Sequence, residues 1–283
     1  MGLKWPATRP VTMRREQARE TEMTLSQRDA DDRYCEAQLA SDGFVCLPDS
    51  CDDAFLTSIL EVSHQRIHEV MAALGDKEIG IGSAAGYHEI VQRSPGRWDL
   101  PISPAQFGIG VKQVPWWPLV VMVLGDDAEH SFSGIVFSDP GSPAQCWHID
   151  SPHLDAAHLK PHALNVLVAL DDISMDMGPT EMAVASHLLT NHHRNRALVR
   201  DELVYQHAGT SPELLVEGAR DCVPERRVSA LTAGSCLVFD DRIMHRGLAN
   251  NSSQRRFVAY FSYRRKAYLE NTHFESQRSV FER

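Results

Sequence analysis

The feature that most restricts the fold is a succession of short apolar runs that fills the chain after Trp117. Most of these runs are rich in β-branched and aromatic residues and are bounded by Gly, Pro, Asp or Asn. The runs are SGIVFSD, AQCWHID, ALNVLVALDD, TEMAVAS, RVSAL, GSCLVFDD and RRFVAYFSY. Strands of this length separated by turn residues are typical of antiparallel sheets. They predict a mainly β fold, an antiparallel barrel or jelly roll with helices packed outside it.

The chain before Trp117 has a different character and predicts helices. The run RYCEAQLASDGFVCLPD indicates a helix followed by a short strand. Asp52 or Asp53 can cap the next helix, and Gly75 is suited to end it. Residues 76–105 are expected to be rich in loops, and RSPGRWDLP is their most distinctive segment.

The domain organisation follows from composition along the chain. Residues 1–28 are polar and lack periodicity, so we expect a flexible N-terminal tail and then one domain over residues 29–283. Residues 188–225 form a long insertion between two expected strands and are rich in His, Arg and Glu. Such an insertion is often a lid over a site. A helical decoration with no part in the site is an equally open interpretation.

Charge and cysteine content narrow the possible partners and compartments. The net charge of −10 argues against non-specific nucleic-acid binding and against docking on anionic membranes. None of the 6 cysteines forms a CxxC pair, and their spread is typical of a reducing compartment. We therefore expect a cytoplasmic protein with a small-molecule partner, although the basic first fifteen residues leave organelle targeting open. No pattern in the sequence specifies an oligomeric state.

The segment WHID suggests a metal site. In a strand, His148 and Asp150 point to the same face, so one imidazole and one carboxylate can reach a common point. Two histidines and one carboxylate form the facial triad of non-haem iron(II) oxygenases. His153 and Asp155 repeat the HxD pattern, but they follow Pro152 in a loop-like segment. We therefore prefer the first pair as metal ligands.

The remaining parts of such a site lie far along the chain. His245 ends the run GSCLVFDDRIMH and is the candidate third ligand. Arg256 opens the strand after it, and a buried guanidinium there could hold the distal carboxylate of 2-oxoglutarate. Arg255 is the adjacent competitor, but strand alternation would point it to the opposite face.

At these residues the sequence resembles the phytanoyl-CoA dioxygenase family of 2-oxoglutarate oxygenases. The matching segments are QCWHID, NVLVALDDISMDMGPTEMAVASH and GSCLVFDDRIMHRGLANNSSQRR, with DGFVCLPD and RSPGRWDL similar to the N-terminal region of the family. The resemblance implies a cupin-like double-stranded β-helix, Fe(II) as the metal, and 2-oxoglutarate and O₂ as co-substrates. It also implies that His148, Asp150 and His245 bind the iron and that Arg256 binds 2-oxoglutarate.

The resemblance extends to further positions around the co-substrate. It implies that Gln145 and Thr180 contact 2-oxoglutarate and that Asn165 lines the pocket. The sequence departs from the family at Ala185, where a glycine is usual, and this questions the local backbone geometry. His187 is not a ligand position in the family, and we interpret it as a structural, hydrogen-bonded histidine.

The expected activity is oxidation of a C–H bond in a small-molecule metabolite, by hydroxylation or desaturation, with release of succinate and CO₂. Related halogenases have a small residue in place of the carboxylate, so the presence of Asp150 disfavours halogenation. Two alternatives stay open: a metal-dependent hydrolase or isomerase on the same fold, and a non-catalytic sensing or binding protein. The aromatic residues that could line a substrate pocket, or belong to the core, are Trp98, Trp116, Trp117 and Phe107.

Overall fold

A large antiparallel sheet forms the main wall of the molecule. The computed structural model describes residues 25–151, 160–188, 225–268 and 276–282, and within them seven strands are ordered β1-β8-β5-β10-β4-β3-β2. Their bounds are β1 Phe44–Leu47, β2 Val91–Ser94, β3 Arg97–Pro101, β4 Glu129–Ser138, β5 Ala163–Ala169, β8 Cys236–Asp240 and β10 Arg256–Arg264. All the pairings are antiparallel; β2 and β3 are consecutive in the sequence, while β8, β5 and β10 bring distant parts of the chain side by side.

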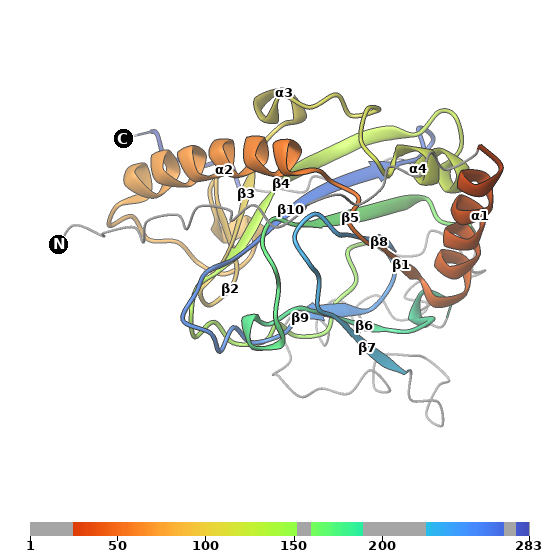
Figure 1. Ribbon diagram of the computed structural model, residues 1–283. Helices are drawn as coiled ribbons and strands as arrows, with labels where there is room; N and C mark the ends of the chain where they lie inside the picture. The colour runs from red at the N-terminus through yellow and green to blue at the C-terminus, as the bar shows by residue number, and fades with distance from the viewer. Residues whose placement is uncertain (1–24, 152–159, 189–224, 269–275, 283) are drawn as a thin grey trace.

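A smaller sheet faces the large one. Its described strands are ordered β7-β6-β9, with bounds β6 Thr180–Ala183, β7 Arg226–Ser229 and β9 His245–Gly247. The small sheet lies on the side of the large sheet opposite helix α2, Asp53–Leu74 (Figure 1). The two sheets together form the sandwich of a jelly roll, which confirms the predicted fold class.

Helices cover the outer face of the large sheet. Helix α2 buries Ile59, Ile67 and Val70 in the main hydrophobic core. Asp52 caps it by accepting a hydrogen bond from the Phe55 amide at 2.8 Å, as expected for an aspartate at this position. The other helices are α1 Leu25–Asp42, α3 Pro104–Phe107 and α4 Trp117–Leu124, with short 3₁₀ turns at Ser83–Ala85, Met175–Met177 and Ser186–Leu188. No helix of the described residues is long and apolar enough to cross a membrane.

Strand alternation gives the large sheet two chemically different faces. On the helix side, Val166 and Val168 of β5 and Phe261 of β10 belong to the main core. On the side of the small sheet, β5 presents Asn165 and β10 presents Ser262, and these two side chains are hydrogen-bonded to each other. Polar groups are thus gathered between the two sheets, which is where a site can form.

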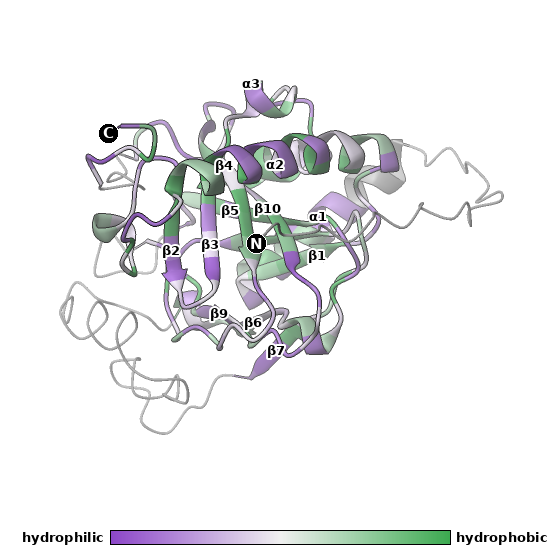
Figure 2. Cartoon of the chain, turned by 90° about the vertical axis from the view of Figure 1, so that its left-hand side faces the viewer, coloured by the Kyte–Doolittle hydropathy of each residue, from purple (hydrophilic) through white to green (hydrophobic). Residues whose placement is uncertain are grey.

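The structure differs from the sequence-based expectations in three places. The region expected to be loop-rich contains the hairpin β2–β3, which turns at Gly96 with a φ of 69°. The sequence did not indicate this hairpin, because strand β3 is mostly hydrophilic, unlike the hydrophobic β4 beside it (Figure 2), and charged residues are uncommon in strands. Helix α1 begins at Leu25, inside the expected tail, since no Gly or Pro interrupts the segment. The segment around His148 makes a single β-bridge to His245 rather than a regular strand.

Candidate metal centre

The three predicted metal ligands converge between the two sheets. A β-bridge joins the backbones of His148 and His245, with N···O distances of 3.1 and 2.9 Å. Asp150 follows two residues after His148, and its amide donates to Asp241 O at 2.9 Å. One ligand atom from each of the three residues lies within 4.8 Å of the other two, close enough to share one ion.

Hydrogen bonds fix which nitrogen of each imidazole faces the ion. Nδ1 of His148 lies 3.0 Å from Cys146 O, and Nδ1 of His245 lies 3.0 Å from Ile243 O. A carbonyl oxygen only accepts, so both Nδ1 atoms donate to these carbonyls and Nε2 is the atom that each ring would offer to a metal. Burial, and next the proximity of His245, lower the pKa of His148 to about 4, which keeps this imidazole neutral. Neutral imidazole is the form that binds a metal.

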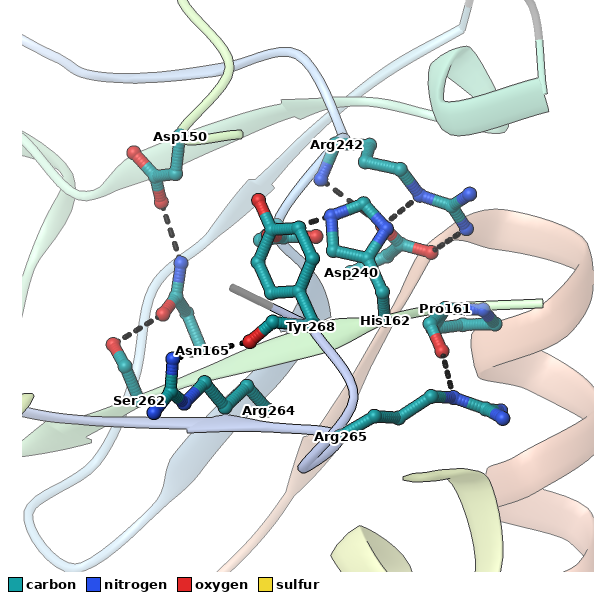
Figure 3. A network of polar contacts seen from close by, with 11 residues as sticks. Asp150, Pro161, His162, Asn165, Asp240, Arg242, Ser262, Arg264, Arg265 and Tyr268 are labelled. Atoms are coloured by element: carbon teal, nitrogen blue, oxygen red, sulfur yellow. Dashed lines mark hydrogen bonds and ion pairs between the residues drawn. The ribbon is translucent and has the colours of Figure 1, made fainter. Parts of the chain in front are cut away.

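A hydrogen-bond relay orients the carboxylate of Asp150. Asn165 Nδ2 donates to Asp150 Oδ2 at 2.6 Å, and Ser262 donates its hydroxyl to Asn165 Oδ1 (Figure 3). Partners of this kind hold a ligating carboxylate in position. Asn165 therefore contacts a candidate metal ligand, and its direct contact with 2-oxoglutarate stays a prediction.

The donor set fits iron(II) of the facial-triad type. Two imidazoles and one carboxylate suit this metal, and three protein ligands leave coordination positions for other groups. The rival pair His153 and Asp155 lies outside the described residues, as does most of the insertion 188–225.

Arg256, the first residue of β10, and Arg255 directly before it point to opposite sides, as alternation predicts. Arg255 pairs with Asp139, with Nη2···Oδ1 at 2.6 Å. Arg256 is only 3% exposed and donates to Gly178 O and to Ser138 Oγ. Within the described residues it has no carboxylate partner, and its Nε has no hydrogen-bond acceptor. Burial lowers its pKa to about 10.

Gln145 and Thr180 lie on the same side of the small sheet as the ligand His245. Thr180 is the register partner of Gly247 on β9. Gln145 Oε1 accepts from Gly247 N at 3.0 Å and from Arg97 Nη1 at 2.8 Å. The structure thus brings these predicted co-substrate residues together around Gly247, and it adds Arg97, which the sequence analysis missed.

The aromatic residues considered for a substrate pocket belong mainly to the helix-facing core. Trp116 is fully buried and donates its indole N–H to Tyr263 OH at 2.9 Å. Trp98 stacks on Phe137, with ring centroids 6.4 Å apart. Phe107 and Trp117 pack against the same core. His187, expected to be structural, is buried with its Nε2 3.2 Å from Ala40 O.

Known proteins share both the sequence pattern and the fold. The family model "Phytanoyl-CoA dioxygenase (PhyH)" matches residues 103–258. Among solved structures, the epimerase SnoN in complex with Fe³⁺, alpha-ketoglutarate and nogalamycin RO has 18% identity and a TM-score of 0.57, with 84% of each chain covered. HygX from Streptomyces hygroscopicus, with nickel and 2-oxoglutarate bound, has 16% identity and a TM-score of 0.55, covering 83% of this chain and 88% of its own.

A third similar structure is AviO1 from Streptomyces viridochromogenes Tue57. It has 13% identity and a TM-score of 0.55, and the match covers 86% of this chain and 98% of AviO1. Identities this low show a shared fold, while the family model matches more than half of the chain in sequence. The chain therefore belongs to the phytanoyl-CoA dioxygenase family and is a non-haem iron, 2-oxoglutarate-dependent oxidoreductase.

Proposed function

We propose that the protein oxidises a C–H bond of a small-molecule metabolite by hydroxylation or desaturation and converts 2-oxoglutarate to succinate and CO₂. One observation carries the proposal. The Nε2 atoms of His148 and His245 and the carboxylate of Asp150 meet in the polar space between the sheets, where Arg256 is buried without a carboxylate partner among the described residues. A metal site beside an uncompensated cation suits a chelating, anionic co-substrate.

His148, Asp150 and His245 would hold the iron. When bound, Fe(II) supplies the redox chemistry that couples decarboxylation of 2-oxoglutarate to substrate oxidation. The work of the protein is to fix the ligand geometry. It does so through the backbone bridge between the histidines and through the Asn165 hydrogen bond to Asp150.

Arg256 would bind the distal carboxylate of 2-oxoglutarate. Its guanidinium can make two parallel hydrogen bonds to a carboxylate, and its burial keeps water from competing. Gln145 and Thr180 would contact the same molecule, and their common neighbour Gly247 on β9 supports this assignment. The co-substrate would therefore be held at both ends, which sets its orientation at the metal.

The proposed outcome rests on the carboxylate and on the similar structures. Asp150 would fill the ligand position that a halide needs, and its proximity to both histidines supports oxidation without halogen transfer. SnoN was solved with nogalamycin RO and HygX with hygromycin B, which supports a small-molecule substrate here. SnoN is an epimerase and SnoK a carbocyclase, so the products must be analysed by mass as well as by structure.

The test combines metal binding with turnover of the co-substrate. Under anaerobic conditions the wild-type protein with Fe(II) and 2-oxoglutarate should show a weak visible charge-transfer band. In air it should form succinate from 2-oxoglutarate. His148→Ala, Asp150→Ala and His245→Ala should each abolish both signals, because three protein ligands are needed. His153→Ala, the matched change in the rival motif, should leave them intact.

Two results would refute the proposal. Loss of the band in His153→Ala but not in His148→Ala would show that the wrong HxD pair had been chosen. Absence of both the band and succinate in the wild type would favour a hydrolase, an isomerase or a sensing protein on the same fold. If the wild type gives both the band and succinate, untargeted profiling of metabolites with and without the protein would identify the substrate by a mass change of one oxygen or two hydrogens.

A further inference from the structure

Arg97 is a buried cation beside the candidate site. It begins β3, it is 1% exposed, and its register partner on β4 is Ser138. Ser138 is also the register partner of Arg256, so the two arginines flank the same serine on the inner face of the sheet. Arg97 donates through Nη1 to Gln145 Oε1 at 2.8 Å and through Nη2 to Leu248 O at 2.9 Å.

The charge of Arg97 is not balanced by the described part of the chain. Within the described residues it has no carboxylate partner, and its buried Nε has no acceptor. Burial, and then the nearby charge of Arg256, lower the pKa of Arg97 well below its ordinary value. Two buried like charges are costly unless an anion joins them. Arg242 shows the usual structural arrangement, since it is equally buried but is paired with Asp240 at 2.6 Å.

The backbone opposite Arg97 is shaped to admit its guanidinium. A Cβ atom on Gly247 would lie 1.6 Å from Arg97 Nη1 and 2.9 Å from Gln145 Oε1. The absence of a side chain at position 247 is therefore required for Arg97 to reach Gln145. Because Thr180 pairs with Gly247 in the small sheet, Arg97 lies amid the residues expected to hold 2-oxoglutarate.

The contacts of Gln145 determine which way its amide faces. Its Oε1 is taken by Arg97 Nη1 and by Gly247 N, both of which are donors. The Nε2 group, which carries two hydrogens, must then point away from Arg97. A donor held in this orientation suits an oxygen-rich anion and would not suit another donor.

We propose that Arg97 is a positioning residue for 2-oxoglutarate, acting by holding Gln145 with its amide N–H groups directed at the co-substrate. The inference rests on the proposed function, since it concerns the same co-substrate. The proposal explains why a buried charge is kept at Arg97: it acts when 2-oxoglutarate, a dianion, binds beside it. Arg256 holds the far carboxylate, and Arg97 with Gln145 fixes the orientation of the molecule between that carboxylate and the metal.

The test measures 2-oxoglutarate affinity from the charge-transfer band, anaerobically and with Fe(II) in excess. Arg97→Met and Gln145→Leu should each raise the dissociation constant roughly 10- to 100-fold, as expected for loss of a charge-assisted hydrogen bond. The double variant should bind 2-oxoglutarate no more weakly than the weaker-binding of the two single variants, because both changes interrupt the same interaction between Arg97, Gln145 and the co-substrate. Arg246→Met is the matched control: Arg246 neighbours Gly247, but its side chain pairs with Glu181 at 2.7 Å, so the dissociation constant should not change.

A second pair of measurements guards against a folding defect. Gly247→Ala displaces Arg97 without removing its charge and should shift the band maximum and weaken 2-oxoglutarate binding. Fe(II) affinity measured without 2-oxoglutarate should stay close to wild type in Arg97→Met, because the metal ligands are untouched. A purely structural role predicts the reverse, with lower thermal stability and unchanged 2-oxoglutarate affinity.

The outcomes separate this inference from the proposed function. If wild type and Arg97→Met bind 2-oxoglutarate equally well, the role of Arg97 is refuted and the proposed function stands. If the effects of Arg97→Met and Gln145→Leu multiply in the double variant, the route through Gln145 is refuted. If the wild type gives no band at all, the proposed function fails, and this inference fails with it.

Discussion

Replacement of Arg256 tests the co-substrate site most directly. Arg256→Ala removes a guanidinium that is 3% exposed and that bonds to Gly178 O and Ser138 Oγ, while β10 keeps its pairings with β4 and β5. Arg255→Ala is the matched control. It removes the same side chain one residue earlier, from the opposite face, where the arginine pairs with Asp139.

The size of the effect follows from the burial of the charge. Burial lowers the pKa of Arg256 from 12.5 to about 10, and a shift of this size corresponds to about 3 kcal/mol disfavouring the charged form. A carboxylate that binds the guanidinium returns an energy of this order. We therefore expect Arg256→Ala to weaken 2-oxoglutarate binding roughly 100-fold, within the range of about 2–5 kcal/mol for breaking a buried charge pair.

The assay is an anaerobic titration of 2-oxoglutarate into the Fe(II)-loaded protein, followed by the visible band, together with the apparent KM in turnover. Arg256→Lys should recover only part of the affinity, since an ammonium cannot make the two parallel hydrogen bonds of a guanidinium. Arg255→Ala should change the dissociation constant less than twofold. Equal losses in Arg255→Ala and Arg256→Ala would refute both the alternation argument and the assignment of the carboxylate site.

Three further changes have expected outcomes. Asn165→Leu should lower Fe(II) affinity by about 10- to 100-fold, because Asp150 loses its orienting hydrogen bond; unchanged affinity in a metal titration would contradict the relay. Burial lowers the pKa of His130 from 6.5 to about 4. The free energy of unfolding should therefore fall as the pH falls from 6.5 to about 4, because the unfolded chain takes up a proton that the native state does not. His130→Gln should make this fall smaller by about 1–2 kcal/mol, a value reduced to allow for the partial exposure of His130. An identical pH profile in that variant would count against the argument. Ala185 has a φ of 60°, a left-handed conformation that glycine adopts without steric cost. Ala185→Gly should therefore raise the free energy of unfolding by about 1 kcal/mol in urea titrations. A decrease would show that the turn is not strained.

Local patterns in the sequence predicted much of the fold. Helix α2 begins after Asp52 and ends at Gly75 because capping depends on neighbours a few residues apart. The alternation that separates Arg255 from Arg256 is equally local. The HxD spacing also sufficed to bring His148 and Asp150 together, even though the segment forms a bridge rather than a full strand.

The parts that could not be predicted depend on contacts between distant segments. Arg97 appears in the sequence as one charge in an apparent loop, and its partners Gln145 and Leu248 become neighbours only when β3 faces β9. The alternation of charged and apolar residues in RWDL was a signal for a strand with one polar face, but charged residues are rare in strands. Asn165 was expected in the pocket, but only the folded sheet shows that its amide bonds to Asp150.

The backbone bridge between His148 and His245 also links metal affinity to folding. The two residues are far apart in sequence, so their pairing exists only after the intervening chain has closed its loop and the small sheet has formed. An ion that binds both imidazoles at once binds the native state more tightly than the unfolded chain, and it stabilises the native state increasingly as its concentration rises. We therefore expect the melting temperature of this protein to rise with the concentration of free metal. A substitution that loosens the contact between the sheets will lower the apparent metal affinity even where it touches no ligand.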